Sequence, residues 1–160
     1  MSLMSLDGRS SLHAIHAEAS GVKGWIEAEL EPDTGDARVG AGQLEIALNQ
    51  LSSGNSLYDA ELHRRLDIRR YPAVTGVLSD WQPTVTRGSY RVNGAVTFRG
   101  VTRDVEDNMS LSVEDDRTVV LDGAHLFDIR DYGMDPPRIL ALRVYPEVTI
   151  RVALVGRRVD

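Results

Sequence analysis

The side chains that could do chemistry are few, and their spacing does not bring them together. No cysteine is present, which excludes a thiolate metal site and a cysteine nucleophile. His13 and His16 lie three residues apart on an expected strand, so they point to opposite faces and cannot hold one metal together. No Gly-x-Ser-x-Gly elbow presents a serine nucleophile, and Gly40-Ala41-Gly42 is not followed by the Lys-Ser/Thr of a phosphate-binding loop. The sequence therefore predicts no catalytic residues, no metal and no cofactor.

Arginines gather in one segment that also carries acidic side chains, and this is the most prominent charged cluster. One interpretation is that they face an anionic headgroup or the carboxylates of a partner. The other is a solvated surface laced with salt bridges. The sequence leaves both open for Arg64, Arg65, Arg69 and Arg70.

Charge and hydropathy limit the partners and the location. The formal net charge is −6, so a nucleic-acid partner, which requires a basic face, is not expected. No stretch approaches the roughly 20 apolar residues of a membrane span. The first residues lack the charged and apolar regions of a secretion signal. We therefore expect a cytoplasmic protein with one domain over residues 1–160, in which residues 1–6 are a disordered or tag-derived start.

Apolar side chains recur mainly at every second position, which is the period of a β-strand. Between Val101 and Val113 one parity is largely apolar and the other is wholly polar, as in a half-buried antiparallel strand. Gly100 separates this run from the preceding one and indicates a tight connection. Eight such segments are predicted: 12–18, 22–30, 43–48, 73–81, 90–98, 101–113, 119–127 and 148–154.

Two segments depart from this alternation. Residues 57–70 carry apolar side chains at i, i+4 and i+8, which predicts an amphipathic helix of about three turns. Residues 52–56 offer N-cap candidates, and Pro72 is expected to end the helix because a residue before proline avoids the helical region. The stretch 128–142 contains two adjacent prolines and cannot be a central strand.

Eight mostly antiparallel strands with one helix fit either a sandwich or a closed barrel. A barrel has no free sheet edge, and eight strands enclose an interior that is filled by side chains or holds one small ligand. The inward faces are aliphatic and rich in small residues, which is compatible with an apolar cavity as well as with an interior closed by packing. The candidate ligand-binding side chains share the inward parity of their strands: Ile26, Ala28, Leu44, Ile46, Leu48, Tyr90, Val92, Val96, Phe98, Val105, Met109, Leu111, Val119, Leu121, Ile150 and Val152.

Several segments, spread over most of the chain, resemble the YceI-like family. Residues 90–94, Tyr-Arg-Val-Asn-Gly, run into residues 97–103, Thr-Phe-Arg-Gly-Val-Thr-Arg, and together look like the family's y-x-v-x-G-x-l-t-i-r-G-v-T segment. Residues 127–134, Phe-Asp-Ile-Arg-Asp-Tyr-Gly-Met, look like its f-x-i-x-R-x-D-F-G-l stretch. Arg70-Tyr71-Pro72 is similar to the k-Y-P that follows the family's helix, and residues 147–150 resemble its closing strand.

This resemblance implies an all-β fold, an eight-stranded antiparallel lipocalin-like barrel with one short amphipathic helix. It also implies a non-catalytic binding protein that sequesters a long apolar ligand, a polyisoprenoid or similar lipid, in the barrel interior. The chain departs from the family pattern at the helix, where Arg65-Leu66 stands in place of a Phe-Phe pair. Strand edges left open at one end of the barrel could pair across a homodimer.

Two other functions remain open. A closed barrel could serve as an interaction or stress-response module with no ligand, acting through its helix and residues 128–142. A small-barrel enzyme acting on an amphiphile would need at least two inward titratable groups, and strand parity offers Arg103, Asp107 and His125. An inward Asp107 with no arginine partner would have a raised pKa.

Overall fold

The computed structural model describes residues 2–11, 14–30, 37–115, 117–139 and 142–157, with only the backbone at residues 14, 15, 30, 139 and 142. Among these residues no helix is long and apolar enough to span a membrane. The helix α1 covers Ser56–Leu66, and two short 3₁₀ turns cover η1 (Leu48–Gln50) and η2 (Ile129–Tyr132). The strands are β1 (Leu3–Arg9), β2 (Ala14–Ala19), β3 (Lys23–Leu30), β4 (Ala37–Ala47), β5 (Ala73–Pro83), β6 (Ser89–Phe98), β7 (Val101–Val113), β8 (Thr118–Asp128), β9 (Arg138–Ile139), β10 (Leu142–Arg143) and β11 (Glu147–Arg157).

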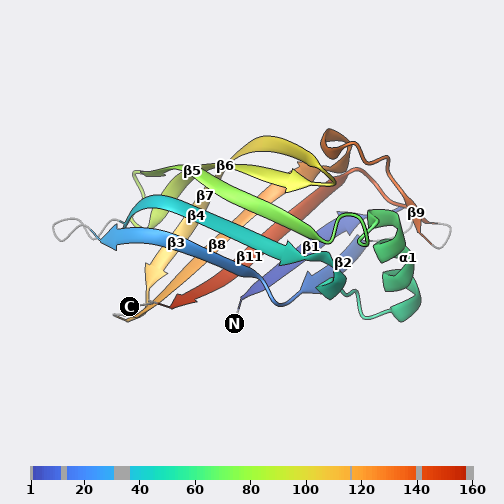
Figure 1. The fold of residues 1–160 in the computed structure, drawn as a ribbon, viewed down its shortest axis with the longest axis horizontal. Helices are drawn as coiled ribbons and strands as arrows, with labels where there is room; N and C mark the ends of the chain where they lie inside the picture. Colours follow the sequence, from blue (N-terminus) through green and yellow to red (C-terminus); the bar gives the residue numbers. More distant parts are fainter. Residues whose placement is uncertain (1, 12–13, 31–36, 116, 140–141, 158–160) are drawn as a thin grey trace.

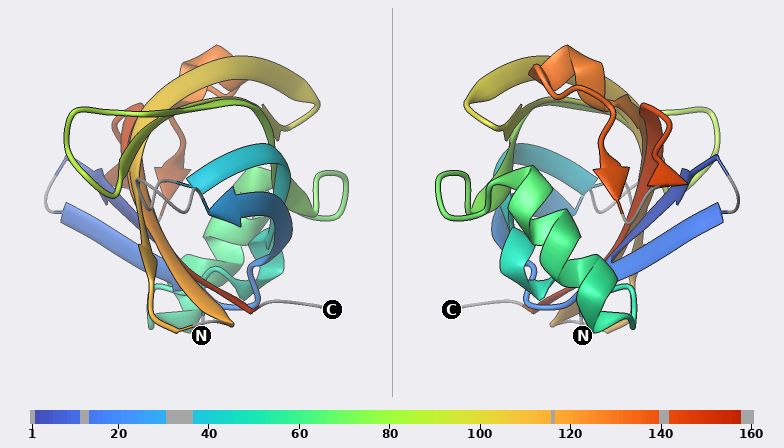
Figure 2. Two further views of the ribbon diagram at one scale, coloured as in Figure 1. Left: turned by 90° about the vertical axis from the view of Figure 1, so that its left-hand side faces the viewer. Right: turned by 90° about the vertical axis from the view of Figure 1, so that its right-hand side faces the viewer.

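Most of the strands form one antiparallel sheet that curls around a long axis (Figure 1). Their order is β2-β1-β11-β8-β7-β6-β5-β4-β3, and β9 and β10 form a separate pair. Seen along the axis, the sheet curls round on itself and α1 crosses one end of it (Figure 2). The predicted all-β antiparallel barrel with one short helix is confirmed, although the described sheet contains nine strands rather than eight.

The ninth strand of the sheet is β1, because β2 and β3 correspond to the predicted segments 12–18 and 22–30. Between β2 and β3 the chain bends and changes its hydrogen-bonded partner. β2 ends at Ala19 and pairs with β1, whereas β3 begins at Lys23 and pairs with β4. Gly21 lies in this bend with a φ of +75°, a left-handed conformation that glycine adopts without steric cost. The two edge strands of the sheet are therefore joined by the chain itself.

The first residues belong to the sheet, so the expectation of a disordered start is wrong for residues 3–6. β1 pairs with β11, with Leu6 opposite Ile150. Met4 is 3% exposed because it points into the core. Its apolar alternation with Ser5 covers too few residues to stand out as a strand in the sequence.

Strand β4 is longer than predicted because it begins at Ala37 rather than at residue 43. Gly40 and Gly42 interrupt the apolar alternation, but the backbone ladder with β3 continues past them. A bulge between Glu27 and Ala28 shifts the register of that ladder.

The helix is shorter than predicted because it ends well before Pro72. Asp67 takes up the left-handed conformation (φ 54°, ψ 54°) directly after Leu66, which stops the helix there. At the other end the Asn55 side chain accepts hydrogen bonds from the backbone N–H groups of Leu57 and Tyr58, as an N-cap does. The expected irregular stretch 128–142 is present as η2 and the short strand β9.

The buried core of the described residues contains two larger clusters near opposite ends of the long axis and a small third cluster formed by Tyr58 and Val144. The helix-end cluster lies beneath α1, and the far-end cluster lies where β4 begins and β5 ends (Figure 1). In the far-end cluster the Trp81 and Tyr90 rings stack with centroids 4.7 Å apart. The helix-end cluster consists of Met4, Ala17, Ala19, Ile46, Leu51, Leu66 and Met134, and the far-end cluster of Ala37, Val39, Trp81, Tyr90 and Leu111.

One buried hydrogen bond ties the far-end cluster together, and its loss should be measurable. The Ala37 backbone N–H donates to the Tyr90 hydroxyl over 2.9 Å. We expect Tyr90→Phe to lower the free energy of unfolding by about 1–3 kcal/mol, because a buried donor loses its partner. Urea denaturation is the measurement, and Tyr145→Phe at an exposed ring is the control. Equal stability of both variants would contradict this role for the hydroxyl.

Candidate functional site

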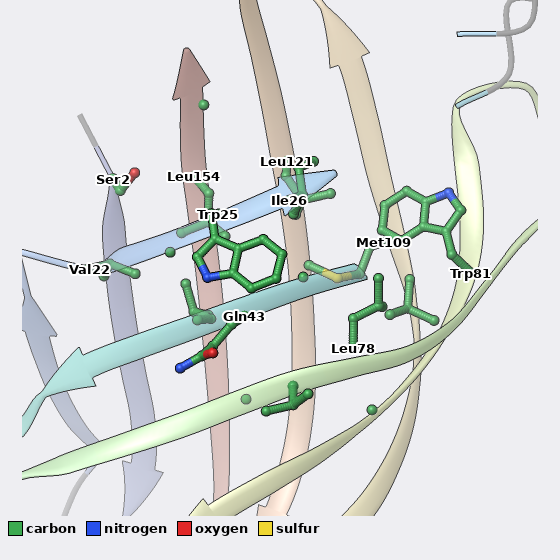
Figure 3. A pocket seen from close by; sticks show the side chains of 18 of the residues that line it. Ser2, Val22, Trp25, Ile26, Gln43, Leu78, Trp81, Met109, Leu121 and Leu154 are labelled. Atoms are coloured by element: carbon green, nitrogen blue, oxygen red, sulfur yellow. The ribbon is translucent and has the colours of Figure 1, made fainter. Parts of the chain in front are cut away.

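A cavity of about 300 Å³ lies inside the curled sheet between the two core clusters. Its wall is built almost entirely of carbon, and side chains of β3, β5, β7, β8 and β11 converge on it (Figure 3). Eight of the candidate side chains line it: Ile26, Leu44, Val92, Val96, Val105, Met109, Val119 and Leu121.

One inward position of the cavity wall, Gly76, carries no side chain and faces open space. Gly76 lies opposite Leu44 on one side and Val96 on the other, and all three line the cavity. A Cβ atom added to Gly76 would meet no heavy atom within 4 Å. At this position the wall therefore borders open space rather than packed side chains.

The cavity opens between two strand edges that have no backbone partner among the described residues. β3 pairs with β4 alone, and the β1 partner of β11 reaches only as far as Ala153. Residues 22–26 from one edge and 154–156 from the other line the cavity. Trp25 and Ile26 are 52% and 38% exposed, as expected for side chains at an opening.

Both tryptophans of the chain line this cavity, although neither was among the candidate residues. Trp25 has the opposite parity to Ile26, so no periodicity could have indicated it. Trp81 lies at the far end of β5, and its buried indole N–H has no hydrogen-bond partner among the described residues. Leu78 and Leu154 also line the cavity, and the alternation within their strands could have identified them.

The other eight candidate residues lie outside the cavity wall. Ile46 belongs to the helix-end cluster, and Phe98, Ile150 and Val152 pack against that cluster. Leu48 is buried in η1. The remaining three are Tyr90 and Leu111, which belong to the far-end cluster, and Ala28, which is exposed beside the β-bulge.

One hydrogen-bonded pair of titratable side chains adjoins this apolar surrounding. Asp107 lines the cavity, and the Nδ1 atom of His125 lies 2.7 Å from its Oδ1 and 2.6 Å from its Oδ2. Burial raises the pKa of the Asp107 carboxyl above its usual range, and the hydrogen bond from His125 offsets part of that rise. Arg103, the third inward candidate, instead donates from Nε to the Asp131 backbone oxygen over 2.9 Å.

The two other described histidines, His16 and His63, do not line the cavity. His16 is exposed and bonds to Asp7 and Glu18, which raise its pKa. The His63 ring donates to the Leu51 backbone oxygen over 2.8 Å, whereas His13 lies outside the described residues. Within the described part of the chain, no three His, Asp or Glu side chains are grouped so that they could hold a metal.

The helix arginines are engaged at the surface of α1. Arg64 donates through Nη2 to Glu61 over 2.6 Å, and Arg65 donates through Nε to the same carboxylate over 3.1 Å. These bonds lower the pKa of Glu61. The Arg70 guanidinium lies 5.2 Å from the centroid of the Tyr71 ring. Such exposed pairs are typical of a solvated face and stabilise the fold little.

Comparison with known proteins identifies relatives of the same fold. The sequence model of the YceI-like domain family matches residues 6–156, so the chain belongs to the YceI-like family. No curated protein matches the chain. Among solved structures, BcnA of Burkholderia cenocepacia is 18% identical, with 97% of this chain and 96% of that chain covered and a TM-score of 0.80.

Two further solved structures share the fold. A polyisoprenoid-binding domain from Saccharophagus degradans, implicated in plant cell wall breakdown, is 13% identical, with coverage of 99% and 94% and a TM-score of 0.81. The YCEI protein of Campylobacter jejuni is 10% identical, with coverage of 90% and 85% and a TM-score of 0.69.

The opposing influences on Asp107 can be separated by removing its partner. We expect His125→Leu to raise the pKa of Asp107 further, because burial remains while the hydrogen bond that stabilises the carboxylate is lost. The measurement is a ¹³C NMR titration of the aspartate carboxyl carbons, assigned with Asp107→Asn. An unchanged or lowered pKa in His125→Leu would show that the imidazole does not stabilise the carboxylate.

Proposed function

We propose that this YceI-like protein is a non-catalytic carrier that sequesters a long apolar ligand, a polyisoprenoid or similar lipid, in the cavity of its barrel. The observation that carries the proposal is the apolar, glycine-lined cavity that opens between β3 and β11. Burying one methylene group contributes roughly 0.8 kcal/mol, so a chain of several isoprene units could bind without a specific polar contact.

The eight candidate side chains in the cavity wall are the proposed ligand contacts. They come from β3, β4, β6, β7 and β8 and thus surround the space from several directions. The volume of about 300 Å³ is at the lower end of the range for small-molecule sites. A long chain would therefore fill the cavity with one end and extend through the opening past Trp25 and Ile26.

The position of the two tryptophans gives this proposal a direct readout. Trp25 is half exposed at the opening, and Trp81 is buried deeper in the wall. A ligand that enters would move the Trp25 indole from water into apolar surroundings, so its emission should shift to shorter wavelength. Trp25→Phe removes this shift and leaves the signal of Trp81.

A leucine at Gly76 should block the cavity without disturbing the barrel. The side chain would occupy the open lumen, because no atom lies within 4 Å of the added Cβ. We expect Gly76→Leu to weaken farnesol binding at least tenfold, as measured by tryptophan emission and by native mass spectrometry. Its melting temperature should not fall, because glycine is an unfavourable residue within a strand.

Gly40→Leu is the matched control, because Gly40 also has no atom within 4 Å of an added Cβ but does not line the cavity. It should bind farnesol as the unchanged protein does. If the unchanged protein binds no farnesol, or if Gly76→Leu binds it equally well, the carrier proposal is wrong.

A further inference from the structure

An ionisable side chain in the wall of an apolar cavity is unfavourable for a site that takes a pure hydrocarbon. Asp107 is such a side chain, and His125 is its hydrogen-bond partner. The side chains of Asp107 and His125 are 26% and 27% exposed, so water still reaches them in the empty barrel. An apolar chain that displaced this water would leave part of the carboxylate without hydrogen-bond partners. Such a loss costs more for a charged group than for a neutral one.

The strand register places this pair between the cavity and the helix-end cluster. Directly opposed residues of antiparallel strands share one face. Asp107 lies opposite Val92 in the cavity wall. On the other side, His125 lies opposite Ile150, which packs against the helix-end cluster. The pair thus stands where the hollow part of the barrel meets its packed end.

The pair also lies where the backbone ladder between β7 and β8 stops. The register of these strands extends from Val113 opposite Val119 to Met109 opposite Gly123. Asp107 and His125 lie two residues beyond this last pair, so their side chains continue the connection that the backbone no longer makes. Linking the two strands explains why the two groups touch each other. It leaves the other hydrogen-bond acceptor positions of the Asp107 carboxylate unexplained.

These remaining acceptor positions are available to a ligand. Among the described residues, His125 is the only hydrogen-bond partner of the Asp107 carboxylate. An ionised carboxylate can accept about four hydrogen bonds, and the imidazole N–H supplies one. A neutral donor such as a hydroxyl would fill this capacity, whereas an ether oxygen has no hydrogen to donate. A carboxylate headgroup would be repelled by the like charge.

We propose that Asp107 and His125 form a polar subsite that binds the hydroxyl of a long-chain alcohol, so that the barrel selects an isoprenoid alcohol over a chain with no hydrogen-bond donor. The hydroxyl enters first and donates to the Asp107 carboxylate, and the apolar chain fills the cavity behind it. This inference rests on the proposed carrier function, because it assumes that the cavity takes an apolar chain.

The test compares farnesol with farnesyl methyl ether, which has the same chain and the ether oxygen but no hydroxyl hydrogen. Affinities are measured at pH 7.5 by tryptophan emission. The unchanged protein should bind farnesol about tenfold more tightly than the ether, the effect of one hydrogen bond to a charged acceptor. Asp107→Leu should bind both ligands with equal affinity, because it lacks the carboxylate.

Asp104→Leu is the matched control, since Asp104 is an exposed carboxylate on the same strand. It should keep the preference for farnesol. A measurement that needs no variant is the ¹⁵N NMR spectrum of the His125 ring, which farnesol should shift and the ether should not.

The outcomes separate this inference from the carrier proposal. Equal affinity of the unchanged protein for both ligands, or a preference that persists in Asp107→Leu, overturns the polar subsite and leaves the carrier function intact. Binding of neither ligand overturns both. A preference that is lost in Asp107→Leu and kept in Asp104→Leu supports the subsite.

Discussion

The architecture depends on one bend in the chain at residues 20–22, where a strand exchanges one hydrogen-bonded neighbour for another. Before the bend β2 completes the ladder of β1, and after it β3 completes the ladder of β4. The exchange leaves one edge of β3 and the last residues of β11 without a described backbone partner. If these edges were paired, the ladder would seal the lumen. Because they are not, the cavity has an opening.

Along the barrel axis, the packed regions that stabilise the fold are separate from the hollow region. The buried side chains gather beneath α1 and at the opposite end, where the Tyr90 hydroxyl holds the start of β4. Between them Gly76 lines the wall and leaves room, because no atom lies within 4 Å of a Cβ added there. A hollow centre gives up apolar burial and dispersion contacts, so the two packed ends and the continuous ladders must supply the stability.

The chemical properties of the cavity depend on its side chains rather than on the course of the backbone. At identities of 10–18% the solved relatives share the course of the strands, and this likeness concerns the fold alone. In this chain the Asp107 carboxylate lies in the cavity wall and is hydrogen-bonded to His125. This arrangement places a carboxylate that is costly to bury at the boundary between the hollow and the packed end, where a polar ligand group could reach it.

Alternation of apolar and polar residues was sufficient to identify the β-class, most strand positions and the helix. It also indicated that Asp107 and His125 face inward. It could not separate Val92, which lines the cavity, from Ile150, which packs against the helix-end cluster, since both have inward parity. Nor could it place Ala28, because the neighbouring bulge shifts the register and leaves this residue exposed.

The amino-acid sequence by itself determined which face of each strand is apolar, because side chains alternate with a period of two in any extended strand. Only the tertiary structure decided where along the axis the interior is hollow, which edges remain open and which polar groups meet. Those properties follow from register, bulges and the change of partner at Gly21, all of which depend on hydrogen bonds between segments far apart in the chain.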